Sequence, residues 1–73
     1  MTDTKALREI IDASGLKYKS IAESLGITPF GLQNKIDNVT EFKSSEVKKM
    51  CNLLGINSLK KKEDIFFADK VDK

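Results

Sequence analysis

The sequence predicts an all-α fold in which four or five short helices pack around one core. Apolar residues recur three and four positions apart in successive segments, which is the spacing of one face of a helix. Gly15, Gly26 and Gly55 each follow such a segment, at the position where a helix commonly ends in a left-handed residue. A chain of 73 residues has the size of one domain, so we expect a single domain over residues 1–67 and a frayed tail over residues 68–73.

The first two helices are predicted mainly from their apolar faces. The first spans about residues 4–14, and Asp3 or Thr4 can cap its N-terminus. The second spans about residues 18–25, although Lys17 before it is a poor N-cap. The residues expected on the two faces are Leu7, Ile10, Ile11 and Ser14 in the first helix, and Ile21, Ala22 and Leu25 in the second.

The third helix has the clearest signals for its start. Thr28 is a good N-cap, and Pro29 stands at the first helical position, where its missing N–H costs nothing. Ile27 before the cap and Leu32 in the helix form a hydrophobic staple. Leu32 and Ile36 continue the buried stripe, and we expect the helix to end one or two residues after Ile36.

Two further helices are expected after a loop at residues 38–43, in which Phe42 is the apolar anchor. Ser44 and Ser45 open the fourth helix. A short fifth helix covers about residues 58–67. The apolar residues of these helices are Val47, Met50, Cys51 and Leu54 in the fourth, and Leu59, Ile65, Phe66 and Phe67 in the fifth.

The composition argues against several functional classes. The chain has no histidine and one cysteine, Cys51, which excludes an internal disulfide, a metal site built on these residue types and a histidine-based catalytic triad. The sequence has no glycine-rich phosphate loop and no nucleophile motif, so we expect neither an enzyme nor a cofactor. No apolar run is long enough to span a membrane, and no secretion signal follows Met1. With a single free thiol, the expected location is the cytoplasm.

Residues 18–37 have the most informative pattern. Two short helices are separated by the turn Gly26-Ile27-Thr28, and the small side chain of Ala22 permits the helices to approach closely. Gly26 supplies the positive φ that a tight turn needs. The net charge of +2 is weak, although residues 17–49 hold six lysines against four acidic residues. The pattern predicts a helix-turn-helix unit.

A resemblance to the helix-turn-helix of the Cro/CI (XRE-like) phage-repressor family is carried by the segment Ile21-Ala22-Glu23-Ser24-Leu25-Gly26-Ile27-Thr28, followed by Leu32 and Ile36. The resemblance extends to about Leu59. It implies a lambda-repressor-like domain that binds double-stranded DNA, with the second helix of the unit in the major groove and the first across the backbone. It also implies a repressor-like transcription regulator of prophage, plasmid or antitoxin type that binds as a homodimer.

The resemblance also assigns candidate DNA contacts. The groove-facing positions are Thr28, Pro29, Phe30, Gln33 and Asn34, with Lys35 beside them. The amides of Gln33 and Asn34 can bond an adenine edge, and Phe30 can pack on a thymine methyl group. Contacts to phosphate are expected from Lys35 and Lys43, and from Lys17, Tyr18 and Lys19 at the start of the unit's first helix.

A second interpretation is a protein-interaction module that keeps this fold and docks a partner through the Phe30 face. The low net charge favours this interpretation slightly. The loop Asn38-Val39-Thr40-Glu41 also favours it, because it has an acidic residue and no basic one, whereas the corresponding loop in the family is often basic. Phe30 has three expected environments: a DNA surface, a protein partner or the domain itself. This interpretation leaves open whether the protein partner is a toxin or an antirepressor.

Overall fold

The computed structural model describes residues 1–68, which form five helices and no strand. The helices are α1 (Thr4–Ser14), α2 (Tyr18–Leu25), α3 (Pro29–Ile36), α4 (Ser44–Leu54) and α5 (Leu59–Phe66). The expected all-α domain of four or five helices is confirmed. The tail expected to fray over residues 68–73 lies outside the described residues, except for Ala68. Of the helices within residues 1–68, none has the length and apolar character needed to cross a membrane.

Local capping signals set the starts of the helices. Asp3 and Thr28 accept hydrogen bonds from first-turn N–H groups of α1 and α3, at 3.1 and 2.9 Å. Lys17 makes no side-chain cap for α2, in line with its side-chain chemistry. α4 begins at the expected residue, but its N-cap is Lys43, whose backbone N–H donates to Glu46 Oε1 at 2.8 Å. The Glu46 carboxylate therefore fixes the start of α4 from within its first turn.

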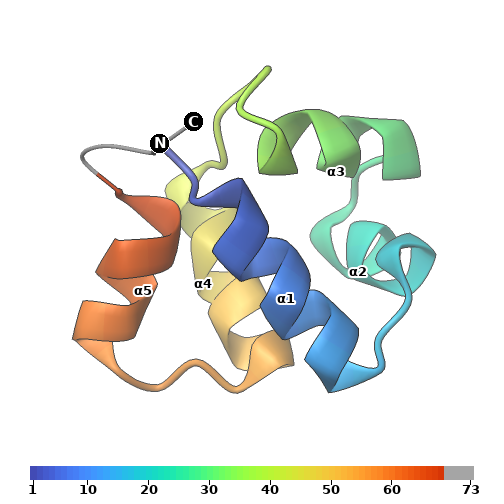
Figure 1. Cartoon of the computed structure of the whole chain (residues 1–73). Helices are drawn as coiled ribbons and strands as arrows, with labels where there is room; N and C mark the ends of the chain where they lie inside the picture. The colour runs from blue at the N-terminus through green and yellow to red at the C-terminus, as the bar shows by residue number, and fades with distance from the viewer. Residues whose placement is uncertain (69–73) are drawn as a thin grey trace.

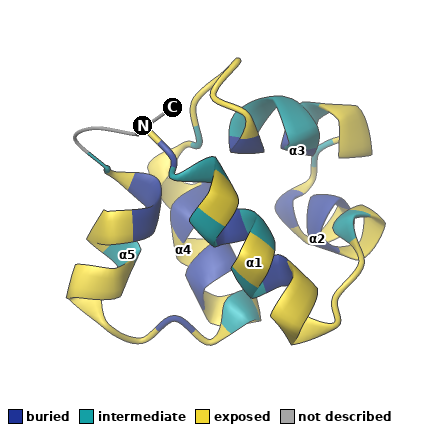
Figure 2. Ribbon diagram, viewed as in Figure 1, coloured by how far each residue is buried: buried dark blue, intermediate teal, exposed yellow. Residues whose placement is uncertain are grey.

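The hydrophobic core lies where the helices meet (Figure 2). α2 packs against α3 and α4, while α1 packs against α3, α4 and α5. The expected loop anchor, Phe42, packs edge-on against Phe66 with ring centroids 5.5 Å apart. The sequence pattern places Ser14, Leu59 and Phe67 on apolar faces, but all three are exposed, because each stands at a helix end beyond the packed turns. The buried apolar residues are Leu7, Ile11, Ile21, Ala22, Leu25, Leu32, Ile36, Val47, Met50, Cys51, Ile56, Ile65 and Phe66.

The turn between α2 and α3 is a Schellman motif. The N–H of Ile27 donates to the carbonyl of Ala22 at 3.0 Å, and the N–H of Gly26 donates to the carbonyl of Glu23 at 3.1 Å. Gly26 has a φ of +74°, which a residue with a Cβ atom adopts only at a cost. Ala22 is fully buried where α2 meets α3. The two helices and this turn form one unit, the α2–turn–α3 unit, at one side of the molecule (Figure 1).

The first three residues tie the end of α3 to the end of α5. Asn38 follows α3 with a φ of +65°, and its side chain bonds both the N–H and the C=O of Thr2, at 2.8 and 2.9 Å. On the other side, the N–H of Asp3 donates to the carbonyl of Ile65 at 2.7 Å. Figure 1 shows the N-terminus between these two helix ends. The segment therefore joins two elements that are far apart in the sequence.

Candidate nucleic-acid interface

α3 has a buried inner side and an accessible outer side. Leu32 and Ile36 are fully buried and hold the helix on the core. Phe30 is 75% exposed, so packing against the domain is excluded as its environment. Gln33 and Asn34 are half-buried at the flanks of the helix. The expected groove-facing residues together are named the α3 surface: Thr28, Pro29 and Phe30 are exposed, and Gln33 and Asn34 are half-buried.

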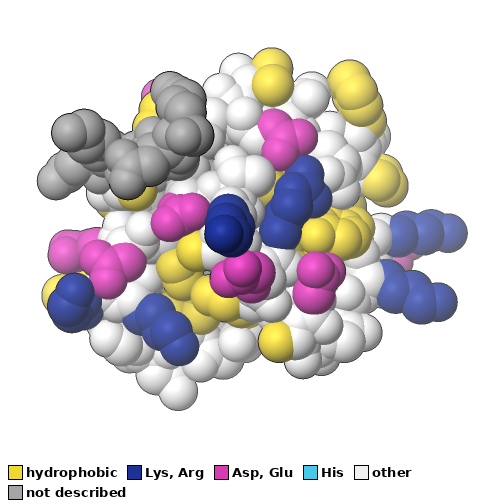
Figure 3. Space-filling model, viewed as in Figure 1, with side chains coloured by type: hydrophobic (Ala, Val, Ile, Leu, Met, Phe, Trp, Pro, Cys, Tyr) yellow, Lys and Arg dark blue, Asp and Glu magenta, His cyan; other side chains and the backbone are white. Residues whose placement is uncertain are grey.

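The start of α2 lies close to the α3 surface. Lys17 and Lys19 are exposed, and Lys or Arg side chains project from the side of the molecule where α2 lies (Figure 3). Tyr18 is half-buried, and its ring lies 5.7 Å from the guanidinium carbon of Arg8. The first turn of α2 has no side-chain cap, so its N–H groups stay available. Free N–H groups and two ammonium groups together favour a negatively charged partner.

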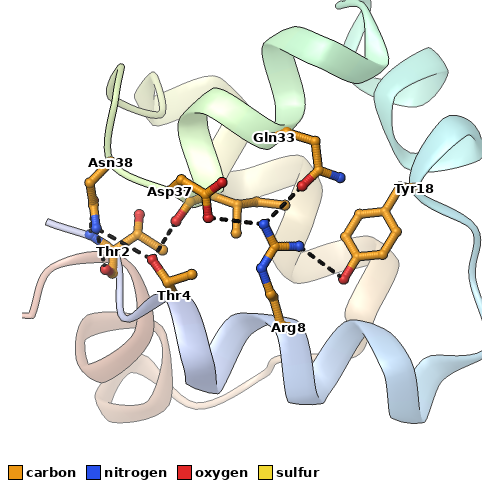
Figure 4. Close-up of polar contacts among 8 residues, drawn as sticks. Thr2, Thr4, Arg8, Tyr18, Gln33, Asp37 and Asn38 are labelled. Atoms are coloured by element: carbon orange, nitrogen blue, oxygen red, sulfur yellow. Dashed lines mark hydrogen bonds and ion pairs between the residues drawn. The ribbon is translucent and has the colours of Figure 1, made fainter. Parts of the chain in front are cut away.

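Arg8 of α1 connects α2 to α3. Its Nη2 donates to Gln33 Oε1 at 2.8 Å and to Asp37 Oδ1 at 2.9 Å, and its Nη1 donates to the Tyr18 hydroxyl at 3.4 Å (Figure 4). The hydrogen bond to Asp37 raises the pKa of Arg8 above its ordinary value, so the guanidinium stays charged. Sequence reasoning missed Arg8 because its partners are 10 to 29 residues away along the chain. A single basic residue on the polar side of a helix gives no signal of such contacts.

Lys35 has a different role from the phosphate contact expected of it. Its Nζ lies 3.1 Å from Glu46 Oε1 and donates to the carbonyl of Glu41 at 3.0 Å. The side chains of Lys35 and Glu46 are only 13% and 9% exposed. Burial raises the pKa of Glu46, but hydrogen bonds from the Lys43 backbone and from Lys35 outweigh burial and leave this pKa below its ordinary value. Lys35 therefore fastens α3 to α4 and is engaged inside the domain.

Lys43 stands just before α4 with an exposed side chain. Its backbone N–H is held by Glu46, and Glu46 pairs with Lys35 of α3. The Glu46 carboxylate thus connects the backbone of Lys43 to Lys35 of α3, while the side chain of Lys43 is exposed to solvent. A cation on a fixed backbone is suited to a phosphate contact.

Other features of the described chain offer less chemistry. A cavity of about 130 Å³ lies beside the N-terminal residues and is lined by Met1, Thr2, Asn38, Glu41, Phe42, Val47, Phe66 and Phe67. Sites for small molecules are typically about 300 Å³ or larger. Within residues 1–68, no group of three or more Cys, Asp or Glu side chains is arranged to hold a metal ion. The α3 surface and the start of α2 are therefore the strongest candidate site.

Residues 1–68 define an all-α domain in which α3 bears a partly exposed surface with two half-buried amide side chains. The chain matches no protein-family model, no curated protein and no solved structure. Similarity to the Cro/CI family therefore stays a prediction from the sequence pattern, and the geometry of the α3 surface is the basis for assigning a function.

Proposed function

We propose that the chain is a cytoplasmic, sequence-specific transcription regulator of Cro/CI (XRE-like) type, which inserts α3 into the major groove of double-stranded DNA. One observation carries the proposal: Leu32 and Ile36 hold α3 on the core, while Phe30 is exposed and the amides of Gln33 and Asn34 are half-buried on the same helix. The major groove admits one α-helix, and amide side chains bond base edges there. α2 crosses the DNA backbone in this arrangement.

The contacts divide into base readers and phosphate binders. None of the side-chain hydrogen bonds within residues 1–68 involves the Asn34 amide, so this amide can donate and accept at an adenine edge. Phe30 packs on a thymine methyl group, and Thr28 and Pro29 lie at the same end of α3. Phosphates are bound by Lys43 and by the start of α2, which comprises Lys17, Tyr18 and Lys19. Lys35 is left out of this set because Glu46 holds its ammonium group.

We further propose that two copies bind a two-fold symmetric operator, since one small module buries only about 600–1,000 Å² on DNA. Repression then follows from occupancy of the operator. A toxin or an antirepressor would regulate this occupancy as a protein partner.

Asn34→Ala and Lys43→Ala are expected to weaken operator binding in different ways. Loss of the Asn34 amide should cost about 1–3 kcal/mol and relax the preference at one base pair of each half-site. Loss of the Lys43 ammonium should weaken all sequences alike. The operator is first selected from a random pool of oligonucleotides, and affinities are then measured by titration. Lys60→Ala, on α5 away from the α3 surface, is the matched control and should leave binding unchanged (Figure 1). Unchanged affinity in both test variants would show that the wrong face is assigned.

Salt dependence distinguishes DNA binding from the second candidate function. If α3 binds DNA, affinity should fall more than tenfold between about 50 and 200 mM salt, because each phosphate contact releases counterions. The exposure of Phe30 favours the alternative, in which α3 docks a protein partner. In that case no oligonucleotide is enriched from the pool, or the weak binding observed hardly changes with salt.

A further inference from the structure

We propose that Arg8 holds the Gln33 amide with its NH2 group outward, so that Gln33 prefers guanine to adenine. This inference rests on the proposed function, since it concerns which base α3 reads. It makes Arg8 of α1 a positioning residue that sets specificity without touching the DNA. Gln33 alone, in the absence of such a contact, pairs with adenine.

The orientation of the Gln33 amide is determined by the chemistry of its neighbour. Arg8 Nη2 lies 2.8 Å from Gln33 Oε1. A guanidinium group has five N–H donors and no acceptor, so the amide atom facing it must be the oxygen. The NH2 group of Gln33 then points away from Arg8, as Figure 4 shows. Reversing the amide would bring its NH2 group against the N–H groups of Arg8.

The contact with Arg8 is held from several sides. The same Nη2 atom donates to Asp37 at 2.9 Å, and Nη1 donates to Tyr18 at 3.4 Å. The guanidinium also lies over the Tyr18 ring. Hydrogen bonds from a charged donor are stronger than those between neutral groups. The Gln33 oxygen is therefore kept on Arg8 when α3 meets a base.

The two amides of the α3 surface consequently differ in what they can read. An adenine edge in the major groove offers the N7 acceptor and the N6 amino donor, so a side chain must donate and accept to bond both. Asn34 retains both functions, while the outward group of Gln33 only donates. A guanine edge offers two acceptors, N7 and O6, which suit an NH2 group. The two neighbouring residues of α3 thus prefer different purines: Asn34 prefers adenine and Gln33 prefers guanine.

The test compares operators selected from a random pool by the wild type, Gln33→Ala and Arg8→Met. Gln33→Ala should relax one base pair of each half-site, and the wild type should prefer guanine there. Arg8→Met frees the Gln33 oxygen and should shift the preference at the same base pair toward adenine by about tenfold. Asp37→Ala is the matched control, because it removes a partner of Arg8 but keeps the contact to Gln33. This control should retain guanine, and thermal melting should show that each variant is folded.

A second measurement needs no variant of Arg8. In the selected operator, the guanine is replaced by 7-deazaguanine, which has a C–H group in place of the N7 acceptor. The wild type should then bind about tenfold more weakly, while Gln33→Ala should be insensitive to the replacement.

The outcomes separate this inference from the proposed function. If the wild type enriches no motif, DNA binding fails and the inference fails with it. If it enriches a motif but prefers adenine where Gln33→Ala relaxes it, the role of Arg8 is refuted and DNA binding stands. The same holds if Arg8→Met keeps guanine, or if no base pair responds to Gln33→Ala.

Discussion

Replacing Lys35 with methionine is expected to lower the free energy of unfolding by about 3 kcal/mol near neutral pH. Lys35 and Glu46 are both mostly covered, and their charged atoms lie 3.1 Å apart. Removing the ammonium leaves the Glu46 carboxylate shielded from water and without a cation beside it. The free-energy cost of a buried unpaired charge is larger than the stabilisation that an exposed ion pair contributes. Urea denaturation followed by circular dichroism measures the loss.

The expected loss depends on pH through Glu46. Its pKa is lowered in the folded wild type, so it contributes stability that is present above the ordinary value of 4.5 and is lost as the pH falls through the lower, folded value. In Lys35→Met, protonation of Glu46 removes the uncompensated charge. The difference between wild type and variant should therefore be largest near neutral pH and should narrow as the pH falls and Glu46 of the variant takes up a proton.

A double variant provides the control for Lys35→Met. In Lys35→Met with Glu46→Met, no charge is left without a partner, and two apolar side chains fill the same space. Stability should return most of the way to that of the wild type. A loss of only a few tenths of a kcal/mol in the free energy of unfolding of Lys35→Met is usual for surface ion pairs. It would show that the Lys35–Glu46 pair does not hold α3 on α4.

Leu32→Ala should destabilise the domain by a similar amount, about 3 kcal/mol. Leu32 is fully buried, so its removal costs apolar burial and leaves a void between α3 and the core. For a chain of this size, the melting temperature should fall by roughly 12–24 °C, at about 4–8 °C per kcal/mol. Operator affinity should fall as well, since Leu32 helps to hold the α3 surface in place.

Val39→Ala is the matched control for Leu32→Ala. Val39 lies in the loop after α3 and is 70% exposed, so its truncation should change stability by no more than about 0.5 kcal/mol. Equal losses in the two variants would mean that α3 is not anchored through its inner side.

Most of the fold could be predicted because its signals are local. The start of α3 depends on Thr28 and Pro29, two neighbouring residues, and the turn depends on Gly26. The buried stripes follow from three- and four-residue spacings within single helices. The same spacing fails at helix ends, where Leu59 and Phe67 share the period of the stripe but lie beyond the packed turns.

The sequence predicts which residues of α3 face outward, but it does not predict their hydrogen-bond and ion-pair partners. The spacing of Leu32 and Ile36 fixes which residues of α3 face outward, so the positions of Phe30 and Asn34 follow from the sequence. The environment of Lys35 does not, because its partner Glu46 comes from the next helix. Contacts of this kind depend on how helices pack, which local patterns do not determine.

The hydrogen bond from the Asp3 N–H to the Ile65 carbonyl has a consequence for folding during synthesis. The first residues leave the ribosome long before Ile65 does. Until then the N–H of Asp3 lacks its native acceptor. Of the two contacts that dock the amino-terminal segment, only the hydrogen bonds between Thr2 and Asn38 can form. A nascent chain that stops after α4 lacks Ile65 and cannot form this hydrogen bond, so the amino-terminal segment closes onto α5 only after α5 has left the ribosome.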